Sequence, residues 1–455
     1  MALLFLLGMS FVMLRGRRQA AVNAILATAA FLPLGQQIVL FGLHLQFFRI
    51  LMIVGLARLF ISGEARGVRF NRLDKLVIAW AIVGFVCGLI RKPEAWMDAD
   101  CLGALCNSLG IYFLFRFLIR HTDEVIAHLR LLVWAAIIIG LAMSYEWITH
   151  KNLFHIFGGV PEFVGERDGR FRCQGPFRHP ILAGTFAATL IPLMIGLWLQ
   201  GGRNRWFSLL GIISAAFSTV VAASSGALLT CVAAMMGFGL WPMRDRMRFF
   251  RRGIVVSIIG LALVMKVPVY YLIAKVSDIL GGTGWHRSYL IDQTIEHFGQ
   301  WWLIGTSYTA NWAPAGEVLA IDPNNMDITN HYIVQGVHGG VLGLGLFIAI
   351  IVTCFQVIGH AWRGGEELFL KPLLLWALGV CLACHCTAFI SISYFDQIQV
   401  FWLWLLAVFA VIMSAAEQEV ASDSLVQTVA NAVDEGIPAA KDCSMMPPAL
   451  GGKSV

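Results

Sequence analysis

The sequence predicts an all-α membrane protein, a polytopic bundle of about 12–13 transmembrane helices. Of its 455 residues 58% are hydrophobic and only 13% are charged, and the mean hydropathy is +0.74, whereas a soluble domain carries roughly 25% charged residues. The apolar residues form continuous runs rather than the alternating pattern of a β-barrel strand. This composition excludes a soluble enzyme, a disordered scaffold and a nucleic-acid-binding protein, although the net charge is +6.

Each apolar run of about 15–25 residues is expected to be a helix that crosses ~30 Å of hydrocarbon. The first run is short for a full span. The expected spans are residues 1–14, 20–35, 38–61, 75–90, 99–119, 126–147, 181–200, 206–222, 226–241, 253–272, 337–359, 372–390 and 397–414.

Clusters of arginine and lysine predict the orientation of these spans. When the helices are followed in order, the clusters fall on one side of the membrane, which the positive-inside rule identifies as the cytoplasm. Arg91 and Lys92 are a minor exception on the far side. The clusters are at residues 15–18, 66–75, 203–205, 244–252 and 363–371.

Two long polar loops then lie outside the cytoplasm, at about residues 150–180 and 273–335. Loops of this length are uncommon unless they carry function or are disordered, and these two contain aromatic residues and helix-like patterns. We expect residues 1–414, including both loops, to form one catalytic domain. Residues 415–455 are polar and are expected to form a flexible cytoplasmic tail.

The first loop concentrates positive charge on the side where such charge is normally depleted. Arg167, Arg170, Arg172 and Arg178 lie within twelve residues, directly before His179. Guanidinium groups suit phosphate oxygens because they stay ionised and present a planar fork of donors. The loop therefore predicts a site for a phosphorylated, membrane-embedded substrate. The alternative is that these arginines bind lipid headgroups or pair with neighbouring acidic residues.

The second loop predicts a helix along the membrane interface at residues 285–302, with an apolar stripe and two tryptophans at its end. Arg287 lies near the start of this helix. Its side chain is a second candidate for phosphate binding, and the alternative is a salt bridge to Asp292 or to another acidic residue of the loop.

The third candidate segment is Asn330-His331-Tyr332, just before a predicted membrane helix. Histidine titrates near neutral pH and can act as a general base. A lone histidine is more often structural, so the residues alone leave both interpretations open for His331.

These segments together resemble the bacterial O-antigen ligase and O-antigen polymerase superfamily, integral membrane glycosyltransferases of the GT-C type. The resemblance covers most of the chain. It rests on the segment from Arg172 to Gly175 that leads to His179-Pro180, on Arg287, and on Asn330-His331-Tyr332 with the glycines at 336–340. One difference is that many members have Ser-Arg-Gly where this chain has Ser224-Ser225-Gly226.

The resemblance implies transfer of a glycan from an undecaprenyl-diphosphate carrier to an acceptor hydroxyl, with inversion and without a metal or other cofactor. Arg172 and Arg287 would hold the diphosphate, and His331 would act in catalysis. The implied location is the bacterial inner membrane, with the site facing the periplasm. Further substrate-binding residues expected on this basis are Arg170, Arg178, His179, Asn330 and Tyr332.

Two alternatives to a polymerase of O-antigen or exopolysaccharide remain. The first is an O-antigen ligase, whose acceptor would be lipid A-core instead of another glycan. The second is a transporter or lipid flippase, which would place ionisable residues along a path inside the helices. Here the candidate residues are concentrated in the outer loops, which favours an enzyme. Expected partners are the lipid-linked donor, the acceptor and membrane lipids, but no nucleic acid.

Overall fold

A computed structural model describes residues 1–40, 43–92, 99–167, 169–202, 205–279, 284–314, 324–362 and 371–434. Within these residues six helices are long and apolar enough to cross a membrane, and four shorter apolar helices accompany them. The prediction of an all-α, multi-pass membrane protein is confirmed at this level. The long spans are fewer than the 12–13 expected because several apolar runs form helices shorter than a full span.

The expected span at residues 253–272 is wrong, because one helix ends at Val264 and the next begins only at Tyr271, after Pro268. The elements otherwise follow the expected runs. In chain order they are α1 (Ala2–Arg15), α2 (Arg18–Phe31), β1 (Gln37–Leu40), β2 (Leu43–Gln46), α3 (Phe47–Ser62), α4 (Arg72–Arg91), α5 (Ala99–Leu118), α6 (Asp123–Thr149), the 3-10 helix η2 (Leu153–Phe157), β3 (Gly165–Arg167), β4 (Arg170–Arg172), α7 (Pro180–Leu199), α8 (Arg205–Val221), α9 (Ser225–Gly239), η4 (Trp241–Arg246), α10 (Met247–Val264), α11 (Tyr271–Ile279), α12 (Gly284–Glu296), α13 (Phe298–Trp301), η5 (Ala310–Trp312), α14 (His331–Ala361), α15 (Pro372–Ala388) and α16 (Asp396–Asp434).

The expected span at residues 38–61 is wrong in its first part. Strands β1 and β2 pair antiparallel, with Gln37 opposite Gln46 and Leu40 opposite Leu43, and helix α3 begins only at Phe47. β-branched residues such as Ile38 and Val39 favour strands, and an apolar run does not by itself distinguish a hairpin from the first turns of a helix.

Helix α7 lies at the centre of the bundle, with 83% of its span buried. Two glycines let neighbouring helices approach it closely. A Cβ added at Gly184 would lie 2.7 Å from the Cβ of Ala227 in α9, and one added at Gly196 would lie 2.6 Å from the Cβ of Ala377 in α15. Because α7 follows the β3–β4 hairpin directly, this packing fixes the end of the first outer loop.

A buried ionic network ties α4, α5 and α16 together. Asn71 and Asp74 form a capping box at the start of α4. The carboxylate of Asp74 also accepts hydrogen bonds from the Tyr112 hydroxyl at 2.7 Å and from Nε of Arg116 at 3.0 Å. Arg116 reaches Ser414 of α16 through Nη2 at 2.8 Å. These partners satisfy the buried charges, as a low-dielectric interior requires.

Helix α14 is broken at Gly340, whose φ of 64° and ψ of −165° are not helical. The chain after α13 enters this break, and the Val341 N–H donates to the Trp302 carbonyl at 2.8 Å. A Cβ at Gly340 would lie 2.3 Å from the Leu303 carbonyl oxygen, so only glycine fits. Arg91 donates to the carbonyl of His338 at 2.7 Å, which explains an arginine on the side where few were expected.

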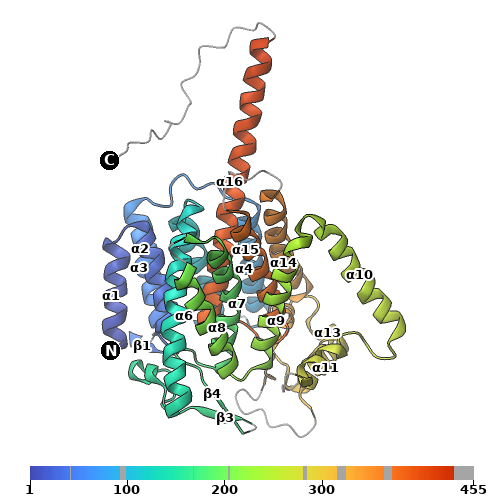
Figure 1. The fold of residues 1–455 in the computed structure, drawn as a ribbon. Helices are drawn as coiled ribbons and strands as arrows, with labels where there is room; N and C mark the ends of the chain where they lie inside the picture. Colours follow the sequence, from blue (N-terminus) through green and yellow to red (C-terminus); the bar gives the residue numbers. More distant parts are fainter. Residues whose placement is uncertain are drawn as a thin grey trace.

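The two outer loops lie at one end of the bundle, where Figure 1 shows β3, β4, α11 and α13 together. Helix α10 stands apart from the bundle, and α16 extends beyond the opposite end (Figure 1). Helix α16 continues to Asp434, so the first part of the expected flexible tail is helical instead, and residues 435–455 lie outside the described residues. The polar residues after 414 are largely good helix formers such as alanine and glutamate, which continue the helix begun by the apolar span.

Candidate functional site

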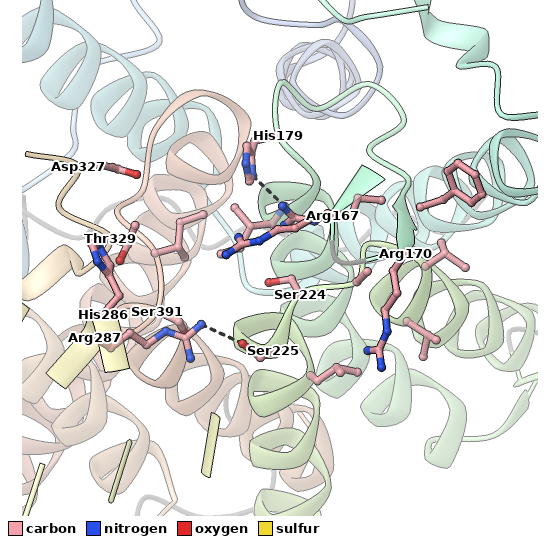
Figure 2. A pocket seen from close by; sticks show the side chains of 18 of the residues that line it. Arg167, Arg170, His179, Ser224, Ser225, His286, Arg287, Asp327, Thr329 and Ser391 are labelled. Carbon is pink, nitrogen blue, oxygen red and sulfur yellow. Dashed lines mark hydrogen bonds between the residues drawn. The ribbon is translucent and has the colours of Figure 1, made fainter. Parts of the chain in front are cut away.

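A cavity of about 990 Å³ opens at the end of the bundle that carries the two outer loops. Its walls come from the β3–β4 hairpin, the link between α8 and α9, the start of α12, the segment before α14 and the link between α15 and α16. Figure 2 shows these walls from close by. The ionisable side chains that line it are Arg167, Arg170, Arg172, His179, His286, Arg287 and Asp327.

The first wall is the hairpin that carries Arg167, Arg170 and Arg172. Strands β3 and β4 pair antiparallel, with Arg167 opposite Arg170. Of the predicted residues, Arg170 and Arg172 thus lie on the cavity, and Arg167 joins them.

Buried Glu146 of α6 anchors the chain immediately after this hairpin. Its two carboxylate oxygens accept the N–H groups of Gln174 at 3.0 Å and of Gly175 at 2.8 Å. The Asn152 side chain donates to the Gly175 carbonyl at 2.8 Å. A buried carboxylate is costly unless it is hydrogen-bonded, and here the bonds hold the backbone that leads from Arg172 into α7.

The second wall brings Arg287 to the N-terminus of α9. Arg287 is 7% exposed, and its Nη2 donates to the hydroxyl of Ser225 at 3.1 Å. Burial lowers the pKa of Arg287, yet a guanidinium stays charged at neutral pH. Arg287 thus places positive charge at the start of α9.

The α9 N-terminus itself suits an anion, because its first N–H groups have no partner within the helix. Ser224 and Ser225 at this N-terminus line the cavity together with Ser391. Ser391 is 2% exposed, and its Oγ has no hydrogen-bond partner within the described chain. A Cβ at Gly226 would lie 2.7 Å from the Cβ of Ser391 and 3.4 Å from Nη2 of Arg287, so glycine permits this close packing.

Asp292, the alternative partner considered for Arg287, has other neighbours. Its two carboxylate oxygens accept hydrogen bonds from the hydroxyls of Tyr270 and Tyr271. These bonds connect α12 to α11 and hold the helix that carries Arg287.

His179 caps α7, and its Nδ1 accepts the N–H of Ile181 at 3.2 Å. Desolvation in the cavity wall, followed by the positive charges of Arg172 and Arg167, lowers the pKa of His179 to about 4. At neutral pH the ring is therefore uncharged, with its proton on Nε2. His179 can donate a hydrogen bond to a substrate oxygen, but it is a poor base.

Acidification is expected to destabilise the protein through His179. The unfolded chain binds this proton below pH 6.5 and the folded chain only below about 4, so stability falls as the pH drops between these two values. The protonated ring also loses its bond to the Ile181 N–H. Thermal unfolding of wild type and His179→Asn, which keeps an N-cap acceptor and does not titrate, measures this. The melting temperature of wild type should fall relative to that of the variant between pH 7 and 4.5; parallel curves would contradict the assignment.

Three further predicted residues do not line the cavity in the described chain. Arg178 forms an ion pair with Asp396, from Nη1 to Oδ2 at 3.2 Å. Asn330 is the N-cap of α14 and accepts the N–H groups of Tyr332 and Ile333. Tyr332 donates its hydroxyl to the Cys386 carbonyl at 3.1 Å. In the described chain these side chains hold the cavity walls, and their contact with substrate stays a prediction.

His331 also lies outside the cavity lining, so the prediction that it shares a cavity with Arg172 and Arg287 is wrong. The ring is 8% exposed. Its Nδ1 accepts the Tyr394 N–H at 3.0 Å, and its Nε2 lies 3.1 Å from Nε2 of Gln335. The backbone N–H of His331 donates to the Phe389 carbonyl at 2.8 Å.

These bonds give His331 a structural role. They fix both ends of residues 389–394, and Ser391, Ile392 and Ser393 of this segment line the cavity. His331 thus supports a cavity wall from behind. The sequence places His331 next to a membrane helix but does not show which way its ring points, and for this reason the expectation failed.

Sequence reasoning missed Asp327, His286, Ser391 and Glu146. Asp327 lies four residues before His331, and His286 is adjacent to Arg287. Their closeness to these predicted residues could have indicated them. Glu146 was visible as a carboxylate inside an apolar run, which is unusual. Ser391 gave no signal, because its place in the cavity depends on a contact between distant parts of the chain.

Comparison of the chain with family models, curated proteins and solved structures gives no match in any of the three. Four arginines and the N-terminus of α9 line a cavity that has a single carboxylate within the described chain. Such a site is suited to a ligand with several negative charges.

Proposed function

We propose that the protein is an integral membrane glycosyltransferase that moves a glycan from an undecaprenyl-diphosphate carrier to an acceptor hydroxyl, as a polymerase of O-antigen or exopolysaccharide. The site would face the periplasm of a bacterial inner membrane. The observation that carries the proposal is the meeting of Arg172 and Arg287, from two separate loops, on one cavity at the end of an apolar helical bundle. The resemblance to O-antigen ligases and polymerases supports the same activity.

The cavity suits the departure of a diphosphate. As the bond between the anomeric carbon and the diphosphate oxygen breaks, negative charge grows on that oxygen, and donors already aimed at this position lower the barrier. Arg287 is held by its bond to Ser225, and the chain after Arg172 is held by Glu146. Because Arg287 is bonded and the backbone after Arg172 is anchored, both groups would need little reorganisation during the reaction.

A lipid-linked substrate has an apolar part and a polar part, and the protein would have to accommodate both. Its polyprenyl chain belongs in the hydrocarbon layer around the apolar helices, while its diphosphate and sugars belong in water. A cavity at the end of the helices, rather than buried among them, suits a substrate with this division. The arginines supply the positive charge, so the proposed transfer requires no metal and should continue in the presence of EDTA.

The proposal is tested with the full-length protein in lipid nanodiscs, supplied with undecaprenyl-diphosphate-linked glycan from the strain that carries the chain. We expect release of undecaprenyl diphosphate together with growth of the glycan. Heat-inactivated protein is the control. Movement of the lipid-linked glycan across proteoliposome membranes without cleavage would contradict the proposal and support a flippase.

A polymerase and a ligase differ in what accumulates when the gene is deleted. Loss of a polymerase leaves single repeat units on the acceptor, and loss of a ligase leaves the finished polymer on its carrier lipid. We expect single repeat units. Gel analysis of the acceptor and mass spectrometry of the carrier lipid distinguish the two, and accumulation of lipid-linked polymer would assign the chain to the ligases.

A further inference from the structure

We propose that Asp327 is the catalytic base of the transfer, the group that takes the proton from the attacking hydroxyl. This inference rests on the proposed glycosyl transfer and adds to it a residue that the sequence did not single out. A hydroxyl attacks an anomeric carbon efficiently only when a nearby group accepts its proton, and carboxylates commonly perform this role in glycoside chemistry. With His331 behind the wall, the base must be found among the residues that line the cavity.

The chemistry of the residues that line the cavity excludes most of them as the catalytic base. Arginine cannot serve as a base because it stays protonated. His179 uses its Nδ1 to accept the Ile181 N–H, so its Nε2 carries the proton. Two groups remain in the described lining, Asp327 and His286, and Asp327 is the one carboxylate among them.

The backbone on both sides of Asp327 is fixed, while its side chain is exposed to the cavity. On one side, buried Met326 packs against Trp312, and its N–H donates to the Thr309 hydroxyl at 3.0 Å. On the other side, buried Asn330 caps α14. A catalytic group needs this combination, a held backbone and an accessible functional atom, because misplacement by about 1 Å costs much of the rate.

Asp327 lies across the cavity from the arginines of the β3–β4 hairpin (Figure 2). Figure 2 shows Asp327, Thr329 and His286 on one wall, and Arg167 and Arg170 on the other. An inverting transfer requires the acceptor and the leaving diphosphate on opposite faces of the sugar. Arg287 comes from the same side as His286, and its guanidinium points toward Ser225 (Figure 2). The diphosphate would therefore lie between Arg287 and the hairpin arginines, and the acceptor would enter beside Asp327.

In the proposed step one bond forms at the anomeric carbon, one bond breaks, and one proton moves to Asp327. The acceptor oxygen forms a bond to the anomeric carbon as the bond from that carbon to the diphosphate oxygen breaks. The diphosphate leaves with the electron pair of the broken bond, and the hydroxyl proton passes to the carboxylate of Asp327. The resulting carboxylic acid returns its proton to water before the next transfer.

The test replaces Asp327 by asparagine, which keeps the shape but cannot accept the proton. Transfer by Asp327→Asn in nanodiscs should fall by about 10²–10⁴-fold, whereas binding of undecaprenyl diphosphate should change by less than about threefold, since a carboxylate does not hold an anionic diphosphate. Its melting temperature should equal that of wild type. Formate added to Asp327→Ala should restore part of the transfer, because a small carboxylate can occupy the vacated space.

The matched variant is His286→Gln, which removes the other candidate base from the same wall. A loss of transfer at least tenfold smaller than that of Asp327→Asn supports Asp327 as the base. Near-normal transfer by Asp327→Asn, or loss of transfer in His286→Gln alone, would overturn the assignment of the base and leave the proposed function intact. If wild type itself releases no undecaprenyl diphosphate, both proposals fall together.

Discussion

Replacing Arg287 by alanine is expected to lower glycan transfer by about 10²–10³-fold, the usual cost of removing one preorganised donor from a site where negative charge develops. Arg287 is almost fully buried and is bonded to Ser225 at the start of α9. Its charge is therefore screened little by water, and its loss removes much of the positive potential at this end of the cavity. Arg172→Ala should give a loss of similar size.

Arg287→Lys tests whether the positive charge alone is enough, because lysine keeps the charge and lacks the planar pair of donors of a guanidinium. We expect about tenfold lower transfer, between wild type and alanine. The control is Arg178→Ala, which removes an equal charge from the first outer loop at a residue paired with Asp396 outside the cavity lining. Single-turnover assays in nanodiscs measure all four variants. Equal losses for Arg178 and Arg287 would show a general effect of net charge instead of a diphosphate site.

Replacing His331 by alanine should also abolish most of the transfer, but through the shape of the cavity. The Tyr394 N–H would lose its acceptor at a cost of about 1–3 kcal/mol, and the space left between Phe389 and Phe347 adds a further penalty. Residues 389–394 would then be free to shift, and with them the wall that contains Ser391. A lower melting temperature should accompany the loss of transfer.

His331→Asn distinguishes support from catalysis. The asparagine oxygen can replace Nδ1 as acceptor for the Tyr394 N–H, but an amide cannot act as a base. We expect this variant to retain transfer within about tenfold of wild type, well above His331→Ala. If both variants fold as wild type and both are inactive, His331 is a catalytic base after all and the proposed role of Asp327 is wrong.

Some features of the site could be read from single residues. Arg172 and Arg287 were chosen because guanidinium groups suit phosphate and because arginine is unusual in an outer loop. Both reasons depend only on the residue type and its position along the chain. Sequence position did not place Arg178 and His331 on the cavity. Arg178 is adjacent to the lining residue His179, and His331 lies two residues after Thr329, yet Arg178 pairs with Asp396 and His331 accepts the Tyr394 N–H.

The sequence by itself determined the class of this protein and the ends of most helices, because continuous apolar runs and local capping residues such as Asn71 act over a few positions. Only the tertiary structure decided which side chains share the cavity. Ser225, Arg287 and Ser391 are separated by 62 residues or more along the chain, and their meeting depends on how α9, α12 and the α15–α16 link pack. The direction of a buried side chain is set by the neighbours that satisfy it, and those neighbours come from distant segments.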